Sequence, residues 1–262
     1  MIGKILAKAN RYRGQVCFGY VCGSTVDAAF FGCVVRLLRE DRGRQIGSTI
    51  GASHTSIVAA GRNDVVRAFL AQEGPGSEWL LMVDTDMTFA PDLVEKMLAT
   101  AAAENAKVVS SIAVARRGLQ LVPNAFSLRF AEDGTPTGCQ PIPYIPAGPC
   151  EVDAAGAACM LIHRSVLEAV GKKFGGSWFA FKEFRHVDGK GMETFFDAGE
   201  DIVFCLRARA VGEPIVVDPS VRLGHVKSQV LVLEDLDAYK EICSAVGEDN
   251  YLASLKARQA GL

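Results

Sequence analysis

A run of four apolar residues that ends in two carboxylates constrains this 262-residue chain more than any other feature. Residues 80–83 (Leu-Leu-Met-Val) are followed directly by Asp84, Thr85 and Asp86. A short apolar run predicts a buried strand, and the carboxyl edge of an open α/β sheet is where ligands bind. Two carboxylates there repel each other unless a cation lies between them, and Mg²⁺ or Mn²⁺ prefers such oxygen ligands. The segment therefore predicts a metal–diphosphate site; the alternative is a turn in which Asp86 or Thr88 caps the helix that follows Pro91.

Composition and charge restrict the class of protein. The chain is 49% hydrophobic with a net charge of −2, which predicts a large core and no broad nucleic-acid footprint. Its most apolar segments, 28–35 and 154–162, are too short to span a bilayer, and residues 1–14 lack the apolar core of a signal peptide. The sequence thus predicts a soluble, cytoplasmic protein without a transmembrane anchor. None of its eight cysteines forms a Cys-x-x-Cys pair, which predicts reduced core residues.

Strands and helices are expected to alternate over residues 15–114. The predicted strands are 15–22, 45–50, 78–83 and 107–114, and the predicted helices are 26–38, 63–72 and 91–104. Ser24 or Thr25 is the expected cap of the first helix. This alternation is typical of βαβ units with a parallel sheet and predicts a Rossmann-type nucleotide-binding half. No Gly-x-Gly-x-x-Gly follows the first strand, which disfavours a dinucleotide oxidoreductase.

The second half of the chain has a different composition. Residues 119–153 are rich in Pro, Gly and Thr, and the runs 125–130 and 141–145 predict hairpins or an added mixed sheet. A helix over 165–170 is expected to end at Gly171. Residues 172–198 carry many aromatic residues and glycines and are expected to form a structureless lid. Further expected elements are helices 199–210, 235–246 and 249–260 and a strand 214–218.

Three segments then align in order. They are Asp84-Thr-Asp86, the helix start Gly199-Glu200-Asp201 with Phe204-Cys-Leu-Arg207 after it, and Asp218-Pro-Ser-Val-Arg-Leu-Gly-His225. Together they resemble the GT-A glycosyltransferases, particularly family 2 and its small phage and bacterial relatives. The resemblance covers roughly residues 15–228. It implies one domain over 1–262, in which a Rossmann-like nucleotide-sugar-binding half (15–114) with a mixed central sheet is fused to an acceptor-binding, catalytic half (115–228). Residues 229–262 would be C-terminal helices.

The resemblance also implies a reaction and a metal. Asp84 and Asp86 match the motif that holds Mn²⁺ or Mg²⁺, and His225 matches a histidine that often completes the metal shell. Such enzymes move a sugar from a nucleoside-diphosphate donor to an acceptor hydroxyl, and the metal neutralises the leaving diphosphate. Glu200 and Asp201 match the acidic pair near the acceptor, with Asp201 the first choice of general base. The alternative role of these two acids is helix capping.

Five further positions are weaker candidates. Arg62-Asn63 resembles an Arg-Asn pair near the nucleotide pocket, although Asn63 could cap a helix and Arg62 could pair with a surface acid. Trp178-Phe179 resembles an acceptor-side aromatic segment, with core packing as the alternative. Gly156 would let backbone approach a ligand, or reflect tight packing.

The loop after the first strand departs from the family pattern. Residues 19–24 replace a Pro-x-x-Asn-like start and an Asp that reads uracil, so the donor base is open, and Tyr20 is a candidate for stacking on it. The motif is shared by inverting and retaining enzymes. The acceptor is equally open among a glycan, a protein and a modified nucleic-acid base. A nucleotidyltransferase acting on sugar phosphates and a non-catalytic nucleotide-sugar- or glycan-binding module are the competing hypotheses. The first needs a Gly-rich basic phosphate loop, which Gly23-Ser24 matches poorly, and the second needs no acid at position 201.

Overall fold

A seven-stranded mixed sheet forms the centre of the computed structural model, which describes residues 14–42, 44–53, 57–72, 76–117 and 120–227. Its strand order is β10 (Cys150–Val152), β15 (Ile215–Arg222), β5 (Val108–Ile112), β12 (Cys159–His163), β3 (Trp79–Asp84), β1 (Val16–Cys22) and β2 (Ile46–Ser53). β1 runs parallel to β2 and β3, and β15 runs parallel to β5. β12 lies antiparallel between β3 and β5, and β10 is antiparallel to β15. The predicted α/β class with a mixed central sheet is confirmed.

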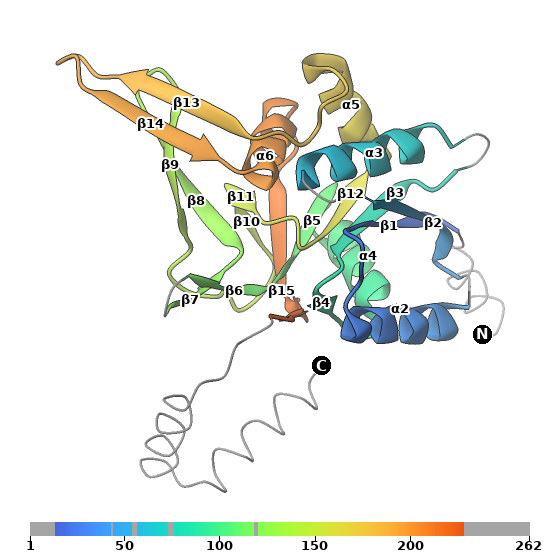
Figure 1. Cartoon of the computed structure of the whole chain (residues 1–262). Helices are drawn as coiled ribbons and strands as arrows, with labels where there is room; N and C mark the ends of the chain where they lie inside the picture. The colour runs from blue at the N-terminus through green and yellow to red at the C-terminus, as the bar shows by residue number, and fades with distance from the viewer. Residues whose placement is uncertain (1–13, 43, 54–56, 73–75, 118–119, 228–262) are drawn as a thin grey trace, which may run out of the picture.

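Helices cover both faces of this sheet (Figure 1). One face carries α3 (Val58–Leu70), α5 (Arg164–Phe174) and α6 (Glu200–Ala210), and the other carries α2 (Ala28–Asp41) and α4 (Leu93–Ala103). Along β3, Leu80 and Met82 enter the core under α3, α5 and α6, whereas Leu81 and Val83 enter the core under α2 and α4. Full burial of each such side chain contributes about 2 kcal/mol. The unbroken apolar run before Asp84 is therefore explained by a strand that is covered on both sides.

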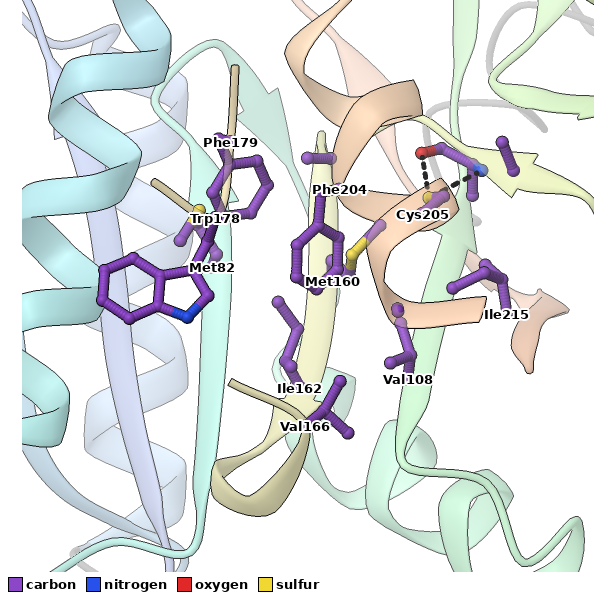
Figure 2. Close-up of a cluster of buried hydrophobic side chains, with 14 of the residues drawn as sticks. Met82, Val108, Met160, Ile162, Val166, Trp178, Phe179, Phe204, Cys205 and Ile215 are labelled. Carbon is purple, nitrogen blue, oxygen red and sulfur yellow. Dashed lines mark hydrogen bonds between the residues drawn. The ribbon is translucent and has the colours of Figure 1, made fainter. Parts of the chain in front are cut away.

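The core beneath α6 is built from stacked aromatic rings (Figure 2). Phe179 stacks on Phe204 with ring centroids 4.6 Å apart, and Trp178 Nε1 donates a hydrogen bond of 2.6 Å to the Leu167 carbonyl. Cys205 lies in the same core, where its Sγ contacts the Ala155 backbone and burial raises its pKa to about 12. All seven cysteines within the described residues are free thiols, and four of them are buried. Cys243 lies outside those residues.

Two helices start at other residues than the sequence predicts. Asp27, not Ser24 or Thr25, caps α2, since its carboxylate accepts a hydrogen bond of 2.7 Å from the Ala29 amide. α3 begins at Val58, so Asn63 lies inside the helix and not at its N-cap.

α5 continues past its expected end. It runs through Gly171 to Phe174 and ends at Gly175, whose φ of +77° is readily available only to glycine. Gly171 serves packing instead, because a Cβ at this position would lie 3.1 Å from the Trp178 ring.

The expected lid is largely regular structure. Residues 172–198 contain the end of α5 and a hairpin of β13 (Lys182–Val187) and β14 (Glu193–Ala198), which projects from the body of the protein (Figure 1). Phe184 and Phe196 stack across this hairpin. The prediction failed because the strands are half-exposed and pair only with each other, which leaves a weak apolar pattern.

Smaller sheets complete the fold. β8 (Ala125–Phe130) matches its prediction, but its partner β9 (Pro136–Pro141) ends where the predicted strand 141–145 begins, and β11 (Ala154–Ala155) joins them. β6 (Val114–Arg117) pairs with β7 (Gln120–Pro123), and β4 (Met87–Thr88) pairs with β16 (Gly224–His225). Helices predicted over 235–246 and 249–260 lie outside the described residues. No helix in the described part of the chain has the length and apolar character needed to cross a membrane.

Candidate active site

A pair of two-residue strands brings Asp86 and His225 together at the carboxyl edge of β3. β3 ends at Asp84, the chain turns through Thr85 and Asp86, and β4 then pairs with β16 so that Met87 faces His225. The Val226 amide also donates to the Asp86 carbonyl at 2.8 Å. As a result His225 Nε2 lies 3.0 Å from Asp86 Oδ2.

The other ring nitrogen of His225 fixes the tautomer. Nδ1 lies 3.2 Å from the Val114 carbonyl oxygen, which can only accept, so Nδ1 carries the hydrogen. Nε2 therefore faces Asp86 either as an N–H of the imidazolium or with a bare lone pair. A histidine that donates one N–H to a backbone carbonyl and offers the other nitrogen is arranged as metal-binding histidines are.

Arg62 of α3 occupies the interior behind Asp84. Its side chain is only 4% exposed, and its guanidinium lies 2.8 Å from Asp84 Oδ1, 2.8 Å from the Ala157 carbonyl and 3.5 Å from Glu200 Oε1. Arg62 Nε has no hydrogen-bond partner among the described residues, so Glu200, whose Oε1 lies 3.5 Å from this atom, compensates it only through charge. Asp84 thus faces a buried cation that the protein itself supplies.

Burial and charge oppose each other at the two acids beside Arg62. Burial raises the pKa of Asp84, and the Arg62 guanidinium lowers it, while the nearby Asp86 and Asp201 carboxylates raise it further. Burial likewise raises the pKa of Glu200, which Arg62 lowers and Asp201 raises. Arg62 therefore stabilises the ionised forms of two carboxylates that burial would protonate.

The start of α6 places the two predicted acids on different partners. Gly199 is the N-cap, and Glu200 and Asp201 lie in the first turn, where the helix dipole favours negative charge. Glu200 turns to Arg62, whereas Asp201 Oδ1 accepts from the Ile202 amide at 2.8 Å. A Cβ at Gly156 would lie 3.5 Å from Asp201 Oδ2, so backbone approaches this carboxylate closely there. The Gly156 amide is held by the Asn124 carbonyl at 2.6 Å.

Three predicted contact residues have structural partners. Asn63 donates to the Phe179 carbonyl at 2.8 Å and accepts from the Phe179 amide at 2.9 Å, so its amide group holds α3 to that segment. Trp178 and Phe179 are buried core residues. Both rings therefore have the core-packing role that was the alternative to acceptor contact.

Tyr20 lies one strand away from the carboxylates. It is half-buried on β1, and a Cβ at its neighbour Gly51 would lie 2.6 Å from the ring, so the ring covers that glycine. The next residue, Val21, pairs with Asp84, and its carbonyl accepts from the Thr85 hydroxyl at 3.4 Å. Tyr20 is therefore near the edge where Asp84 ends β3.

Sequence reasoning missed two features of this edge. The Lys227 ammonium lies 2.7 Å from Asp86 Oδ2, and the only signal for it is a position two residues after His225. A cavity of about 630 Å³ also lies beside the site, and Val114, whose carbonyl holds His225, is one of its walls. Its other lining residues are Ile112, Ile145, Pro146, Ala147, Pro219, Ser220, Arg222 and Leu223.

The side chains at this edge show whether the site fits the expected divalent metal ion. Within the described ranges no three His, Cys, Asp or Glu side chains form a group that could hold a metal ion, and Asp84 faces Arg62. Mg²⁺ is nevertheless commonly held by one or two carboxylates together with substrate phosphates. Asp86 Oδ2 and His225 Nε2, 3.0 Å apart, have the chemistry and spacing of two adjacent ligands of one ion. These two residues fit a divalent metal, and Asp84 fits only as a supporting charge.

Comparisons with known proteins agree with this architecture. Neither protein-family models nor curated protein sequences give a match to the chain. Among solved structures, the chain is similar to GalNAc-T7 in complex with UDP, GalNAc and Mn²⁺, with a TM-score of 0.52 and 10% sequence identity. The chain has a GT-A glycosyltransferase fold. The likeness covers 83% of this chain but 44% of the GalNAc-T7 chain, so this GT-A fold spans less than half the length of that protein.

Proposed function

We propose that this protein is a metal-dependent glycosyltransferase that moves a sugar from a nucleoside-diphosphate donor to an acceptor hydroxyl. The observation that carries the proposal is the Asp86–His225 pair, held 3.0 Å apart at the carboxyl edge of the sheet in a GT-A fold. That edge is the ligand-binding edge of open α/β sheets. GalNAc-T7 in its complex contains UDP and Mn²⁺, which supports UDP as the first donor nucleotide to test.

Each residue of the site has a part in this reaction. Asp86 and His225 would hold the divalent ion, which when bound supplies positive charge to the leaving diphosphate. Arg62 lies behind them, where its guanidinium pairs with Asp84 and lowers the pKa that burial of this carboxyl raises. Asp201 takes the proton of the acceptor hydroxyl on Oδ2, because Oδ1 is engaged by the Ile202 amide and Glu200 is engaged by Arg62.

The cavity beside His225 is the proposed entrance for the acceptor. It opens at the carboxyl ends of β5 and β15, and its walls are mainly aliphatic and proline side chains. A volume of about 630 Å³ lies within the range of small-molecule sites. Because Val114 both lines the cavity and supports His225, an acceptor placed there would lie next to the metal position.

A thermal-shift panel tests the donor site. UDP, GDP, CDP and dTDP are each added with Mn²⁺ or with EDTA, since a ligand of the native state raises its melting temperature by mass action. We expect one nucleotide, UDP first, to give a shift that needs Mn²⁺ and is lost in Asp86→Asn. The matched control is Asp92→Asn, which removes an exposed acid paired with Lys96 on α4 and should keep the shift. A shift of equal size in the wild type and Asp86→Asn contradicts the proposed site.

A further inference from the structure

Asp86 Oδ2 has two side-chain nitrogen atoms beside it at once. His225 Nε2 lies 3.0 Å from this oxygen and Lys227 Nζ lies 2.7 Å from it. The Lys227 side chain is 58% exposed and that of Asp86 is 40% exposed. On the basis of the proposed function, we propose that Lys227 occupies the metal position on Asp86 while no metal is bound, and moves to the donor diphosphate when the metal enters.

A metal ion and the Lys227 ammonium compete for the same oxygen. A divalent cation bound at Asp86 Oδ2 would lie within a few ångström of the ammonium, and like charges at about 4 Å repel measurably even in water. The Lys227 ammonium can leave Asp86 Oδ2 because its flexible side chain is exposed and an exposed ion pair is weak. The ion pair therefore screens Asp86 without blocking it.

The backbone keeps Lys227 beside the site after the ammonium leaves Asp86. The preceding residue, Val226, donates its amide to the Asp86 carbonyl at 2.8 Å, and His225 pairs with Met87. The side chain can therefore turn away from Asp86 while its backbone stays within reach of whatever the metal holds.

The diphosphate is the ligand that a displaced Lys227 would meet. It brings several negative charges to the metal position, and lysine is an effective point-charge ligand for phosphate. Arg62 cannot take this part, because it is buried and already bound to Asp84 and the Ala157 carbonyl. Of the Lys and Arg side chains that pair with Asp84 or Asp86 in the described structure, Lys227 is the exposed one.

Two titrations at one fixed pH test the inference without any turnover. Free Mn²⁺ is measured by electron paramagnetic resonance as protein is added, and UDP binding is then measured by calorimetry at saturating Mn²⁺. The variants are Lys227→Met, Asp86→Asn and the matched control Lys107→Met, which removes another exposed, ion-paired lysine, paired with Glu213. Thermal unfolding of each variant confirms that it is folded.

Opposite signs are expected from the two titrations. Lys227→Met should bind Mn²⁺ about threefold to tenfold more tightly, because the competing charge is gone, and UDP about threefold to tenfold more weakly. Lys107→Met should match the wild type in both. If Asp86→Asn weakens Mn²⁺ binding but Lys227→Met leaves either affinity unchanged, the inference about Lys227 is overturned and the proposed function stands. If Asp86→Asn binds Mn²⁺ as the wild type does, the proposed function fails as well.

Discussion

Asp84 and Asp86 are two residues apart, yet they belong to different electrostatic regions of the molecule. Asp84 joins an interior cluster with Arg62 and Glu200, whose cation is buried. Asp86 joins an edge cluster with His225 and Lys227, whose cation is mostly exposed. A buried cation is costly to remove, whereas an exposed one exchanges readily with solvent or a ligand. The comparison teaches that two carboxylates of one motif can divide the work, with one built into the fold and the other available to a ligand.

The largest expected effect is on the turnover number, and it comes from Asp201, which belongs to neither cluster. Asp201→Asn should lower the turnover number about 10²-fold to 10⁴-fold, because a general base is lost, while the Mn²⁺-dependent UDP shift stays. The measurement is steady-state sugar transfer, or donor hydrolysis when no acceptor is known. Asp197→Asn is the control, since Asp197 is exposed on β14. Turnover unchanged in Asp201→Asn would show that Asp201 is not the general base, whereas no turnover in the wild type would favour the non-catalytic binding module.

The interior cluster is tested by removing its cation. Arg62→Met leaves Asp84 and Glu200 without their guanidinium, and we expect the free energy of unfolding to fall by about 3 kcal/mol in urea titrations. Arg67→Met is the matched control on the same helix, because Arg67 pairs with Asp64 at the surface, and it should cost less than about 0.5 kcal/mol. Equal losses in the two variants would show that Arg62 has no special structural role.

Glu200 gives the interior cluster a pH dependence of defined sign. Its pKa in the folded protein is raised by burial, so folding favours its protonated form. The stability that protonated Glu200 adds is complete below the ordinary pKa of a glutamate and is lost as the pH rises through the raised pKa of the folded protein. A pKa difference of 1 between the folded and unfolded states corresponds to about 1.4 kcal/mol of stability. The difference in unfolding free energy between the wild type and Glu200→Gln should therefore grow from pH 7 to pH 4.5. A difference that shrinks over this range would reverse the assignment, and exposed Glu183→Gln serves as the control.

The smallest effect concerns the aromatic segment next to the interior cluster. Trp178→Phe removes the indole N–H that donates to the Leu167 carbonyl and should cost about 1 kcal/mol of stability. Because the ring is buried, the KM for any acceptor should not change. Trp79→Phe, which alters the other tryptophan, packed edge-on to His163, is the comparison variant. A raised KM with unchanged stability would return Trp178 to the acceptor side.

The sequence predicts the elements whose pattern is local. β3 is found because its apolar run is covered on both faces, and β8 because its short run is bounded by turn residues. The start of α2 is misplaced by a few residues because Ser24, Thr25 and Asp27 are all good caps, and only the backbone path selects Asp27. The hairpin of β13 and β14 is missed because one half-exposed strand stabilises the other.

The candidate site depends even more on contacts between distant parts of the chain, which local patterns do not predict. The motif and the family resemblance single out Asp86 and His225, and β4 and β16, which join them, are too short to show a period. The Val114 carbonyl is 111 residues from His225, and Lys227 is 141 residues from Asp86. Contacts of such long range arise from tertiary pairing, which single-sequence patterns do not encode. The roles of Tyr20, Asn63 and Gly156 as ligand contacts stay predictions.

The antiparallel insertion of β12 has a consequence for synthesis of the chain. Among the strands of the central sheet, β3 and β5 follow each other in the sequence, but β12 lies between them in the sheet. The 46 residues between Ile112 and Cys159 take a ribosome about 2 to 10 seconds to add. Throughout that interval the facing edges of β3 and β5 have no partner strand, and such edges invite pairing with other chains. Until β12 is added, the risk of pairing with another chain therefore lies at these two edges of the nascent first half.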